Sequence, residues 1–205
     1  MKRLTEIGYK TGTDKAVYHG FTEIYDDIFK QYDSPRILEI GVASGQSLRM
    51  YREYFKNPYI VAMEIEPYVA VENCKIVVGD QANVDDLRRC VYGEEPFDII
   101  LDDGGHLMAQ QQISLGYLFR HVKSGGYYIL EDIHSSFLGY CLVPTGYTHT
   151  TYDMLRKMEK KELGFSNYID ESTQQELLDR IESMQFWSRI PNDFSDSGTC
   201  IMKMR

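Results

Sequence analysis

The chain has 205 residues, of which 43% are hydrophobic and 26% are charged, a composition typical of one folded domain with a hydrophobic core. Its net charge of −9 argues against a nucleic-acid partner, because such binding needs a basic surface that neutralises phosphates. We find no apolar run near the roughly 20 residues that span a bilayer and no signal peptide. We therefore expect a cytoplasmic protein, a single domain over 1–205, and no membrane insertion.

Four cysteines are widely scattered along the chain, at Cys74, Cys90, Cys141 and Cys200. They form no C-x-x-C pair and have no histidine at the spacing of a zinc site. We expect reduced, partly buried thiols, as in a reducing compartment.

Short β-branched runs alternate with helical patterns, which predicts an α/β fold with a mainly parallel sheet. An N-terminal region, 1–33, should contain an aromatic-rich helical segment at 14–30 and act as a lid. A core follows at 34–135. Its expected elements are strand 36–40, helix 47–55, strand 59–63, strand 75–78, helix 84–91, strand 97–101, helix 107–122, a turn at Gly125-Gly126 and strand 127–130.

The remaining residues, 136–205, should hold the acceptor region and the last strands. After a looser stretch at 133–150, the expected elements are helix 151–162, helix 173–182, strand 184–190 and strand 199–204. The sequence Ser172-Thr173-Gln174-Gln175 is typical of a capping box at a helix start. Together, the expected strands and helices predict a doubly wound, seven-stranded, mostly parallel sheet with helices on both faces.

Ligands of doubly wound sheets bind at the carboxyl ends of the strands. The first strand leads into Glu39-Ile40-Gly41-Val42-Ala43-Ser44-Gly45-Gln46-Ser47. The glycines permit a tight turn and a close approach, and the next helix offers free N–H groups. The G-x-G-x-x-G and G-K-[ST] motifs are absent, whereas E-x-G-x-x-x-G resembles the first motif of S-adenosylmethionine methyltransferases. The alternative is a strand-to-helix turn without a ligand.

The next two strand ends also carry polar side chains. Glu64 ends the second strand, at about the spacing after Gly45 expected of a ribose-binding acid, although it could be an exposed strand-end glutamate. Asp80 and Gln81 follow the third strand, where an acid or amide could meet an adenine. We expect the cofactor to contact Glu39, Gly41, Gly45, Ser47, Glu64, Asp80, Gln81 and Asp102.

Acidic clusters end the fourth and fifth strands, as Asp102-Asp103-Gly104-Gly105-His106 and Glu131-Asp132-Ile133-His134. Because neighbouring strand ends share a cleft, these carboxylates should repel one another, and a bound cation would relieve the repulsion. Oxygen ligands favour Mg²⁺ or Mn²⁺. The glycine turn could bring His106 over a metal held by Asp103, as a general base. Alternatively, Asp102 caps the next helix and His106 faces solvent.

The motifs LEIGVASGQSL, GDQ, FDIILDDGGH and SGGYYILEDIH together resemble the macrolide sugar O-methyltransferases of the mycinamicin and tetracenomycin-rhamnose type. The segment TDKAVYHGFTEIYDDIF, residues 13–29, is also similar to the N-terminal segment of that family. The resemblance covers most of residues 11–135; the last third matches only in its pattern of elements.

The resemblance implies a Rossmann-like class I methyltransferase with S-adenosylmethionine as donor and Mg²⁺ as second cofactor. It implies that Asp103, Glu131 and Asp132 bind the metal, and that His106 is the general base beside Asp103. It also implies cofactor contacts by Gly41, Glu64 and Asp80. One departure is Gly105, where the family usually has a serine before the histidine; this should make the loop more flexible.

The expected activity is O-methylation of a sugar or glycosylated small molecule. Its acceptor would bind around 133–165, where the aromatic stretches 18–29 and 137–152 could cover it. Alternatively, Tyr and Phe at these spacings are ordinary core residues. Three alternatives remain: a metal-dependent methyltransferase of a catechol or other small diol, a nucleoside-binding protein without turnover, and a dehydrogenase. The acidic clusters argue against the second, and the missing G-x-G-x-x-G argues against the third. The sequence leaves open whether the chain forms a homo-oligomer.

Overall fold

One mixed sheet forms the centre of the computed structural model, which describes residues 1–66, 70–137 and 149–205. The strand order is β3-β2-β1-β4-β5-β7-β6. The strands are β1 (Arg36–Ile40), β2 (Tyr59–Glu64), β3 (Cys74–Val78), β4 (Phe97–Asp102), β5 (Val122–Leu130), β6 (Ile181–Ile190) and β7 (Asp193–Met204). The first five are parallel, and β7 runs antiparallel to both β5 and β6. The predicted seven-stranded, mostly parallel sheet is confirmed.

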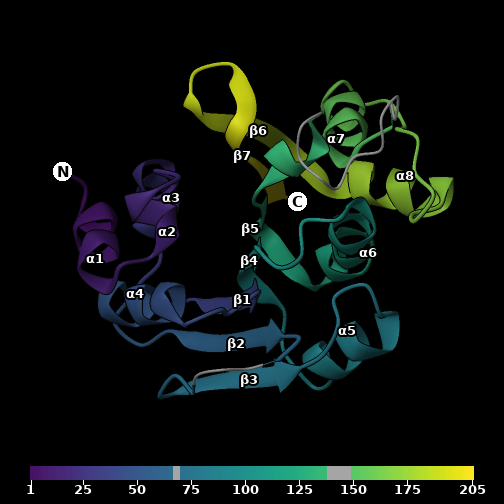
Figure 1. Cartoon of the computed structure of the whole chain (residues 1–205). Helices are drawn as coiled ribbons and strands as arrows, with labels where there is room; N and C mark the ends of the chain where they lie inside the picture. The colour runs from purple at the N-terminus through teal and green to yellow at the C-terminus, as the bar shows by residue number, and fades with distance from the viewer. Residues whose placement is uncertain (67–69, 138–148) are drawn as a thin grey trace.

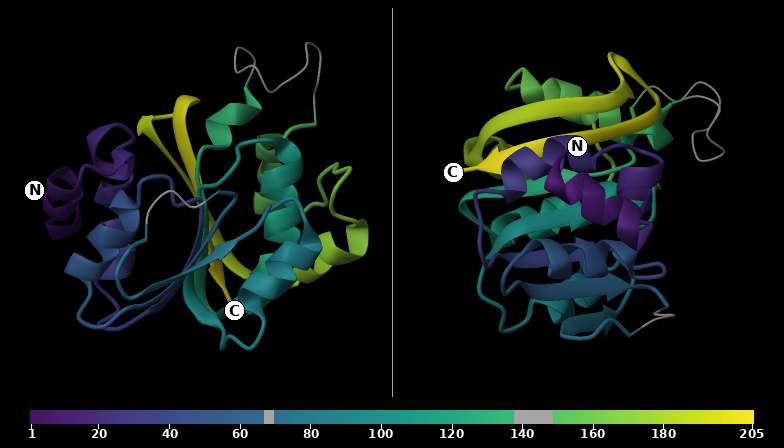
Figure 2. Two further views of the ribbon diagram at one scale, coloured as in Figure 1. Left: turned by 60° about the horizontal axis from the view of Figure 1, so that its bottom comes forward. Right: turned by 90° about the vertical axis from the view of Figure 1, so that its left-hand side faces the viewer.

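Helices cover both faces of the sheet (Figures 1 and 2). One face carries α1 (Arg3–Thr11), α2 (Asp14–Val17), α3 (Thr22–Phe29) and α4 (Gln46–Tyr54). The other carries α5 (Val84–Val91), α6 (Met108–Leu118), α7 (Thr151–Glu159) and α8 (Glu171–Arg180). Short 3₁₀ turns, η1 (Phe119–His121) and η2 (Ile133–Ser136), lie before and after β5. This arrangement buries the central strands on both faces, which explains their continuous β-branched runs.

Two hydrophobic clusters fill the spaces between the sheet and its helices. Aromatic rings dominate the cluster under α1, α3 and α4, where Phe21, Tyr25, Phe29 and Tyr51 are fully buried. The aromatic residues of α3 are therefore part of the core, and the prediction that stretch 18–29 covers an acceptor does not apply to them. The second cluster joins Leu115 and other residues of α5 to α8 to the opposite face.

The N-terminal region differs from the expected helical segment at 14–30. Two helices, α2 and α3, occupy that range, and they are separated by Gly20 at a φ of +75°. An unexpected helix, α1, precedes them and ends at Gly12 in the left-handed conformation. Backbone conformations with positive φ cost glycine little, so both glycines break what composition alone presents as one helical segment.

Some boundaries nearer the C-terminus also differ from expectation. The predicted capping residue Ser172 lies inside α8, and the helix is capped by Asp170, which accepts a hydrogen bond from Thr173 N at 2.7 Å. The expected turn at Gly125-Gly126 lies within β5, where Gly125 has a φ of +80°. The two late strands are longer than predicted because they form one antiparallel hairpin.

Three of the four cysteines lie among the described residues. Cys74, Cys90 and Cys200 are free thiols, as predicted, whereas Cys141 lies outside the described residues. Among residues 1–66, 70–137 and 149–205, no helix is long and apolar enough to cross a membrane.

Candidate active site

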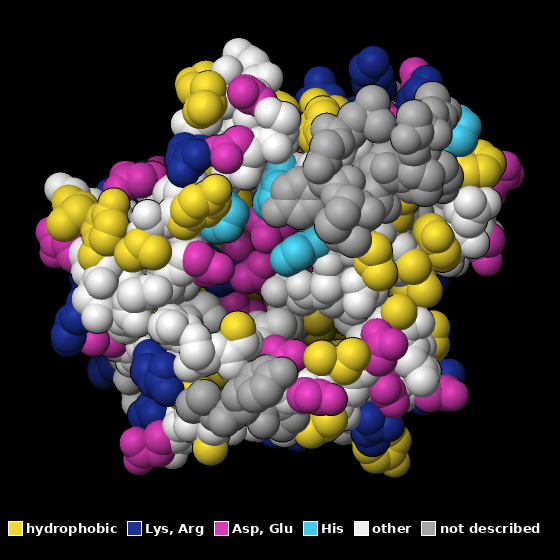
Figure 3. Space-filling model, viewed as in Figure 1, with side chains coloured by type: hydrophobic (Ala, Val, Ile, Leu, Met, Phe, Trp, Pro, Cys, Tyr) yellow, Lys and Arg dark blue, Asp and Glu magenta, His cyan; other side chains and the backbone are white. Residues whose placement is uncertain are grey.

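A pocket of about 510 Å³ opens at the carboxyl ends of β1 to β4. Its volume is in the range of small-molecule and cofactor sites. Acidic side chains lie in the central hollow of the molecule, with histidines at its rim (Figure 3). The predicted residues that line the pocket are Gly41, Ser47, Glu64, Asp80, Gln81, Asp103, His106 and Asp132. Those behind its lining are Glu39, Gly45, Asp102 and Glu131.

The loop after β1 depends on two glycines with left-handed backbones. Gly41 has a φ of +89°, and a Cβ there would lie 2.1 Å from the carbonyl oxygen of Asp103. Gly45 has a φ of +77° at the start of α4, where a Cβ would lie 2.6 Å from Val71 Cγ2. No other residue type fits either position without movement. The loop therefore exposes backbone N–H groups and the N-terminus of α4 to the pocket.

Glu64 holds this loop against the end of β2. Its Oε2 accepts hydrogen bonds from Val42 N at 2.8 Å and Ala43 N at 2.9 Å, and its Oε1 accepts one from Ile65 N at 2.8 Å. Burial opposes ionisation, but these backbone donors outweigh it, so the pKa of Glu64 lies below its usual value. A charged carboxylate therefore lines the pocket and keeps acceptor capacity for ligand hydroxyl groups.

Gln81 and Asp102 form a buried polar pair at one wall. Asp102 Oδ1 accepts a bond from Gln81 Nε2 at 2.9 Å, and its Oδ2 accepts bonds from Tyr128 OH at 2.8 Å and from the Ser114 hydroxyl. Burial raises the pKa of Asp102 to about 6. Asp102 thus positions Gln81 from behind, and the alternative that it caps α6 is wrong, because Leu107 occupies the N-cap.

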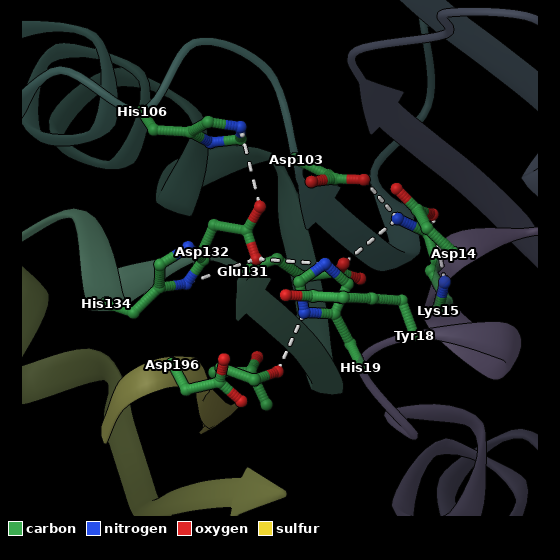
Figure 4. Close-up of polar contacts among 12 residues, drawn as sticks. Asp14, Lys15, Tyr18, His19, Asp103, His106, Glu131, Asp132, His134 and Asp196 are labelled. Atoms are coloured by element: carbon green, nitrogen blue, oxygen red, sulfur yellow. Dashed lines mark hydrogen bonds and ion pairs between the residues drawn. The ribbon is translucent and has the colours of Figure 1, made fainter. Parts of the chain in front are cut away.

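Asp103, His106 and Asp132 meet at the other wall. One ligand-type atom from each lies within 4.8 Å of the others, and His106 Nε2 is 3.4 Å from Asp132 Oδ2 (Figure 4). Asp132 Oδ1 is buried without a hydrogen-bond partner. Burial raises the pKa of Asp132 and lowers that of His106. Two carboxylates that converge in this way fit a divalent cation, and the neutral imidazole beside them is free to act as a base.

Lys15, which the sequence analysis missed, also lines the pocket at this wall, although its side chain is almost fully buried. Its ammonium group contacts Asp103 and lies 3.0 Å from Glu131 Oε2 and 3.5 Å from Glu39 Oε1. Burial would remove the proton, but the three carboxylates outweigh burial and raise the pKa of Lys15 well above its usual value. Nothing in the local sequence of α2 pointed to this role, because all three partners are distant in the chain.

The two buried glutamates have further partners in the core. Glu131 Oε1 accepts a hydrogen bond from Tyr25 OH at 3.0 Å, whereas Glu39 accepts bonds from Ser47 Oγ at 2.8 Å and Tyr51 OH at 3.1 Å. Burial raises the pKa of Glu39 to about 7. The structure thus groups Glu131 with Lys15, and not with the cluster of Asp103, His106 and Asp132; its role as a metal ligand stays a prediction.

Two more histidines surround Asp132. His134 Nδ1 lies 3.5 Å and His19 Nε2 lies 3.9 Å from Asp132 Oδ1. The Nδ1 atom of His19 is 2.7 Å from Ser197 Oγ. Sequence reasoning assigned no role to either histidine, although both stand in the motifs that carried the resemblance. Together with His106 they place three imidazole rings around one buried carboxylate.

Comparison with solved structures identifies the fold. A structure of the methyltransferase MycE of mycinamycin biosynthesis, in complex with Mg, SAH and mycinamycin VI, superposes with a TM-score of 0.77. It is 26% identical to this chain and covers 99% of it. The chain has the class I methyltransferase fold. The same match covers 55% of the MycE chain.

Curated relatives agree with the resemblance stated from the sequence. Mycinamicin VI 2''-O-methyltransferase of Micromonospora griseorubida is 35% identical over 146 residues, which are 65% of this chain and 37% of that protein. The 8-demethyl-8-(2-methoxy-alpha-L-rhamnosyl)-tetracenomycin-C 3'-O-methyltransferase of Streptomyces olivaceus is 31% identical over 65% of this chain and 37% of its own length. The resemblance to sugar O-methyltransferases is confirmed. No protein-family model matches the chain.

Proposed function

We propose that this chain is an S-adenosylmethionine-dependent O-methyltransferase that acts on a hydroxyl group of a sugar or glycosylated small molecule, with help from Mg²⁺ or Mn²⁺. The observation that carries the proposal is the meeting of two sets of residues in one pocket. The glycine loop and Glu64 form one wall, and Asp103, His106 and Asp132 form the other. The chain spans little more than a third of the curated relatives it matches, at 37% of the first.

The glycine loop and Glu64, which we call the cofactor wall, offer the groups that a nucleoside ligand needs. Glu64 presents a charged carboxylate to ribose hydroxyl groups, and the loop at Gly41 allows a ligand to approach the backbone closely. Asp80 and Gln81 lie next along the wall, where they can recognise an adenine. When bound, S-adenosylmethionine supplies an electrophilic methyl group beside the acidic wall.

The acidic wall is suited to hold a divalent cation and to receive a proton. Asp103 and Asp132 offer carboxylate oxygens, and we retain Glu131 as a further candidate ligand. A divalent cation held there would lower the pKa of a bound hydroxyl group. Burial keeps His106 neutral, so its imidazole can accept the proton of the acceptor hydroxyl. Orientation of donor and acceptor in one pocket supplies a further part of the acceleration.

The acceptor class follows from the relatives. One curated relative is named as a 3'-O-methyltransferase of a rhamnosyl tetracenomycin and another as the 2''-O-methyltransferase of mycinamicin VI, and the MycE structure contains mycinamycin VI together with Mg and SAH. We place the acceptor beside α7 and η2, within the predicted region 133–165; of that region, residues 138–148 lie outside the described residues. A catechol or other small diol is the alternative acceptor, because the same acidic wall would serve it.

Transfer of labelled methyl groups tests the proposal. We would incubate the protein with methyl-labelled S-adenosylmethionine and a panel of deoxyhexosides and catechols, with Mg²⁺ and with EDTA. We expect label on a glycoside, and its loss in EDTA. Label on catechols alone would establish the alternative acceptor. Cofactor binding without transfer to any acceptor would indicate a nucleoside-binding protein.

A further inference from the structure

Lys15 occupies an unusual position for a lysine side chain. It is 1% exposed and crosses the ends of three adjacent strands, where it meets Glu39 on β1, Asp103 after β4 and Glu131 after β5. Backbone bonds fix the two loop carboxylates there, from Asp103 N to Ile40 O and from Glu131 N to Asp102 O, each at 2.9 Å. The ammonium group thus faces carboxylates that cannot easily move away.

Because of these contacts, we propose that Lys15 controls the access of a cation to the acidic cluster. Its ammonium group binds the carboxylates of Glu39 and Glu131 and competes with a metal for Asp103 at the pocket. This inference rests on the proposed function, since Asp103 belongs to the proposed metal site. The single positive charge of Lys15 compensates part of the negative charge of Glu39 and Glu131, and the same ammonium group contacts Asp103. It also lowers the net negative charge that an incoming cation meets.

The partners of Lys15 argue against a purely structural ion pair. Two buried glutamates would already compensate one ammonium group, yet Lys15 also contacts Asp103, which lines the pocket. Glu39 and Glu131 have hydroxyl donors of their own in Ser47, Tyr51 and Tyr25. Lys15 is therefore a competitor for one carboxylate of the proposed metal site as well as a charge that repels the metal.

Removal of the ammonium group should tighten metal binding. In Lys15→Met the competitor for Asp103 and the repulsion of a nearby like charge both disappear, and both effects act in the same direction. We expect the protein to bind Mn²⁺ at least about tenfold more tightly than the unmodified chain. A residue that only supports the fold would leave this affinity unchanged or weaken it.

Titration with Mn²⁺ alone, followed by electron paramagnetic resonance of the free ion, measures this affinity without any acceptor. Lys10→Met is the matched control, because Lys10 lies on the neighbouring helix α1 in an exposed ion pair with Glu53. Its Mn²⁺ affinity should equal that of the unmodified chain. The ring centroids of Trp187 and Phe21 lie 5.5 Å apart, so the fluorescence of Trp187 reports whether the N-terminal helices remain docked.

A second variant keeps the inference testable if Lys15→Met does not fold. Lys15→Met combined with Glu39→Gln removes the buried ammonium group together with one of its carboxylate partners and still frees Asp103. We expect Mn²⁺ to bind this double variant more tightly than it binds Glu39→Gln alone. Unchanged or weaker binding in folded Lys15 variants would overturn the inference.

Failure of the proposed function gives a different pattern of results. If the unmodified chain does not bind Mn²⁺ but Lys15→Met does, Lys15 is confirmed as the group that controls cation access. If neither binds the ion, the inference fails, whatever S-adenosylhomocysteine does. If Mn²⁺ binds as predicted but S-adenosylhomocysteine does not, the proposed methyltransferase fails and the role of Lys15 toward the metal stands.

Discussion

The backbone of Gly41 packs directly against the carbonyl oxygen of Asp103, so the end of β1 and the acidic loop after β4 touch without a side chain between them. This contact joins the cofactor wall to the metal wall. A methyl group at position 41 would lie 2.1 Å from that oxygen, and the φ of +89° is one that only glycine adopts readily.

Gly41→Ala should therefore separate the two walls. We expect the free energy of unfolding to fall by about 2 kcal/mol or more, and S-adenosylhomocysteine binding to become undetectable by calorimetry. Gly93→Ala is the control, because Gly93 has a φ of +73° but no heavy atom within 4 Å of a Cβ there. Cofactor affinity in Gly41→Ala that matches Gly93→Ala would contradict the importance of this contact.

Glu64→Gln tests the nucleoside wall. In this variant a neutral amide replaces the charged carboxylate. The carboxylate accepts hydrogen bonds from two loop N–H groups and, in our proposal, from two ribose hydroxyls. Because hydrogen bonds to charged groups contribute about 1.5–3 kcal/mol, we expect S-adenosylhomocysteine affinity to fall about tenfold or more. Glu66→Gln, an exposed neighbour, should bind normally. Equal affinities in the two variants would remove Glu64 from the cofactor site.

His106→Ala tests the proposed base. Turnover with any accepted glycoside should fall by about 100-fold or more, while S-adenosylhomocysteine affinity should change little. Single-turnover assays with labelled cofactor would measure the first quantity and calorimetry the second. His121→Ala provides a control, since His121 lies in η1, away from the pocket lining. Near-normal turnover in His106→Ala would exclude this residue as the base.

Glu94 gives a prediction about pH and stability. Its carboxylate accepts bonds from Arg36 Nη2 at 2.7 Å, Lys75 Nζ at 2.7 Å and Tyr59 OH at 3.1 Å, and so ties β1, β2 and β3 together. Burial alone would raise the pKa of Glu94, but these donors outweigh burial and lower it. The stability it contributes is therefore present above the unfolded pKa of about 4.3 and is lost as pH falls through the folded value.

Glu94→Gln should lower the free energy of unfolding by about 1–2 kcal/mol at pH 7. Urea denaturation at several pH values should also show a shallower loss of stability below about pH 4.3 than in the unmodified chain. Glu95→Gln is the control, since the neighbouring side chain is exposed. Parallel pH profiles for all three proteins would show that Glu94 does not titrate as described.

The fold and the outline of the site could be predicted from sequence because short segments of the chain mark the strands and the polar residues that follow them. Each buried β-branched run identifies a strand, and the polar residues that follow it mark the functional edge of a parallel sheet. Gly41, Glu64, Asp103 and Asp132 were found in this way, and all line the pocket. The α5 boundaries also match, because a clear helical pattern begins after Asn83, whose side chain caps the helix.

The rest of the site depends on the directions of side chains and on contacts between residues that are distant in the sequence. Asp102 and Asp103 are adjacent in sequence, but their side chains leave the strand end in different directions, so one is buried behind the pocket and the other lines it. Lys15 meets partners from three strands, and a lone lysine in a short helix carries no local signal of that arrangement. Spacing in the sequence cannot supply either fact.

Calorimetric titration of S-adenosylhomocysteine into the purified protein, first with Mg²⁺ and then with EDTA, tests the central claim most directly. The account predicts saturable binding of one equivalent per chain in Mg²⁺. It also predicts that Glu64→Gln weakens this binding in both buffers. No binding in either buffer, by protein shown to be folded by circular dichroism, would contradict the assignment of this pocket to S-adenosylmethionine.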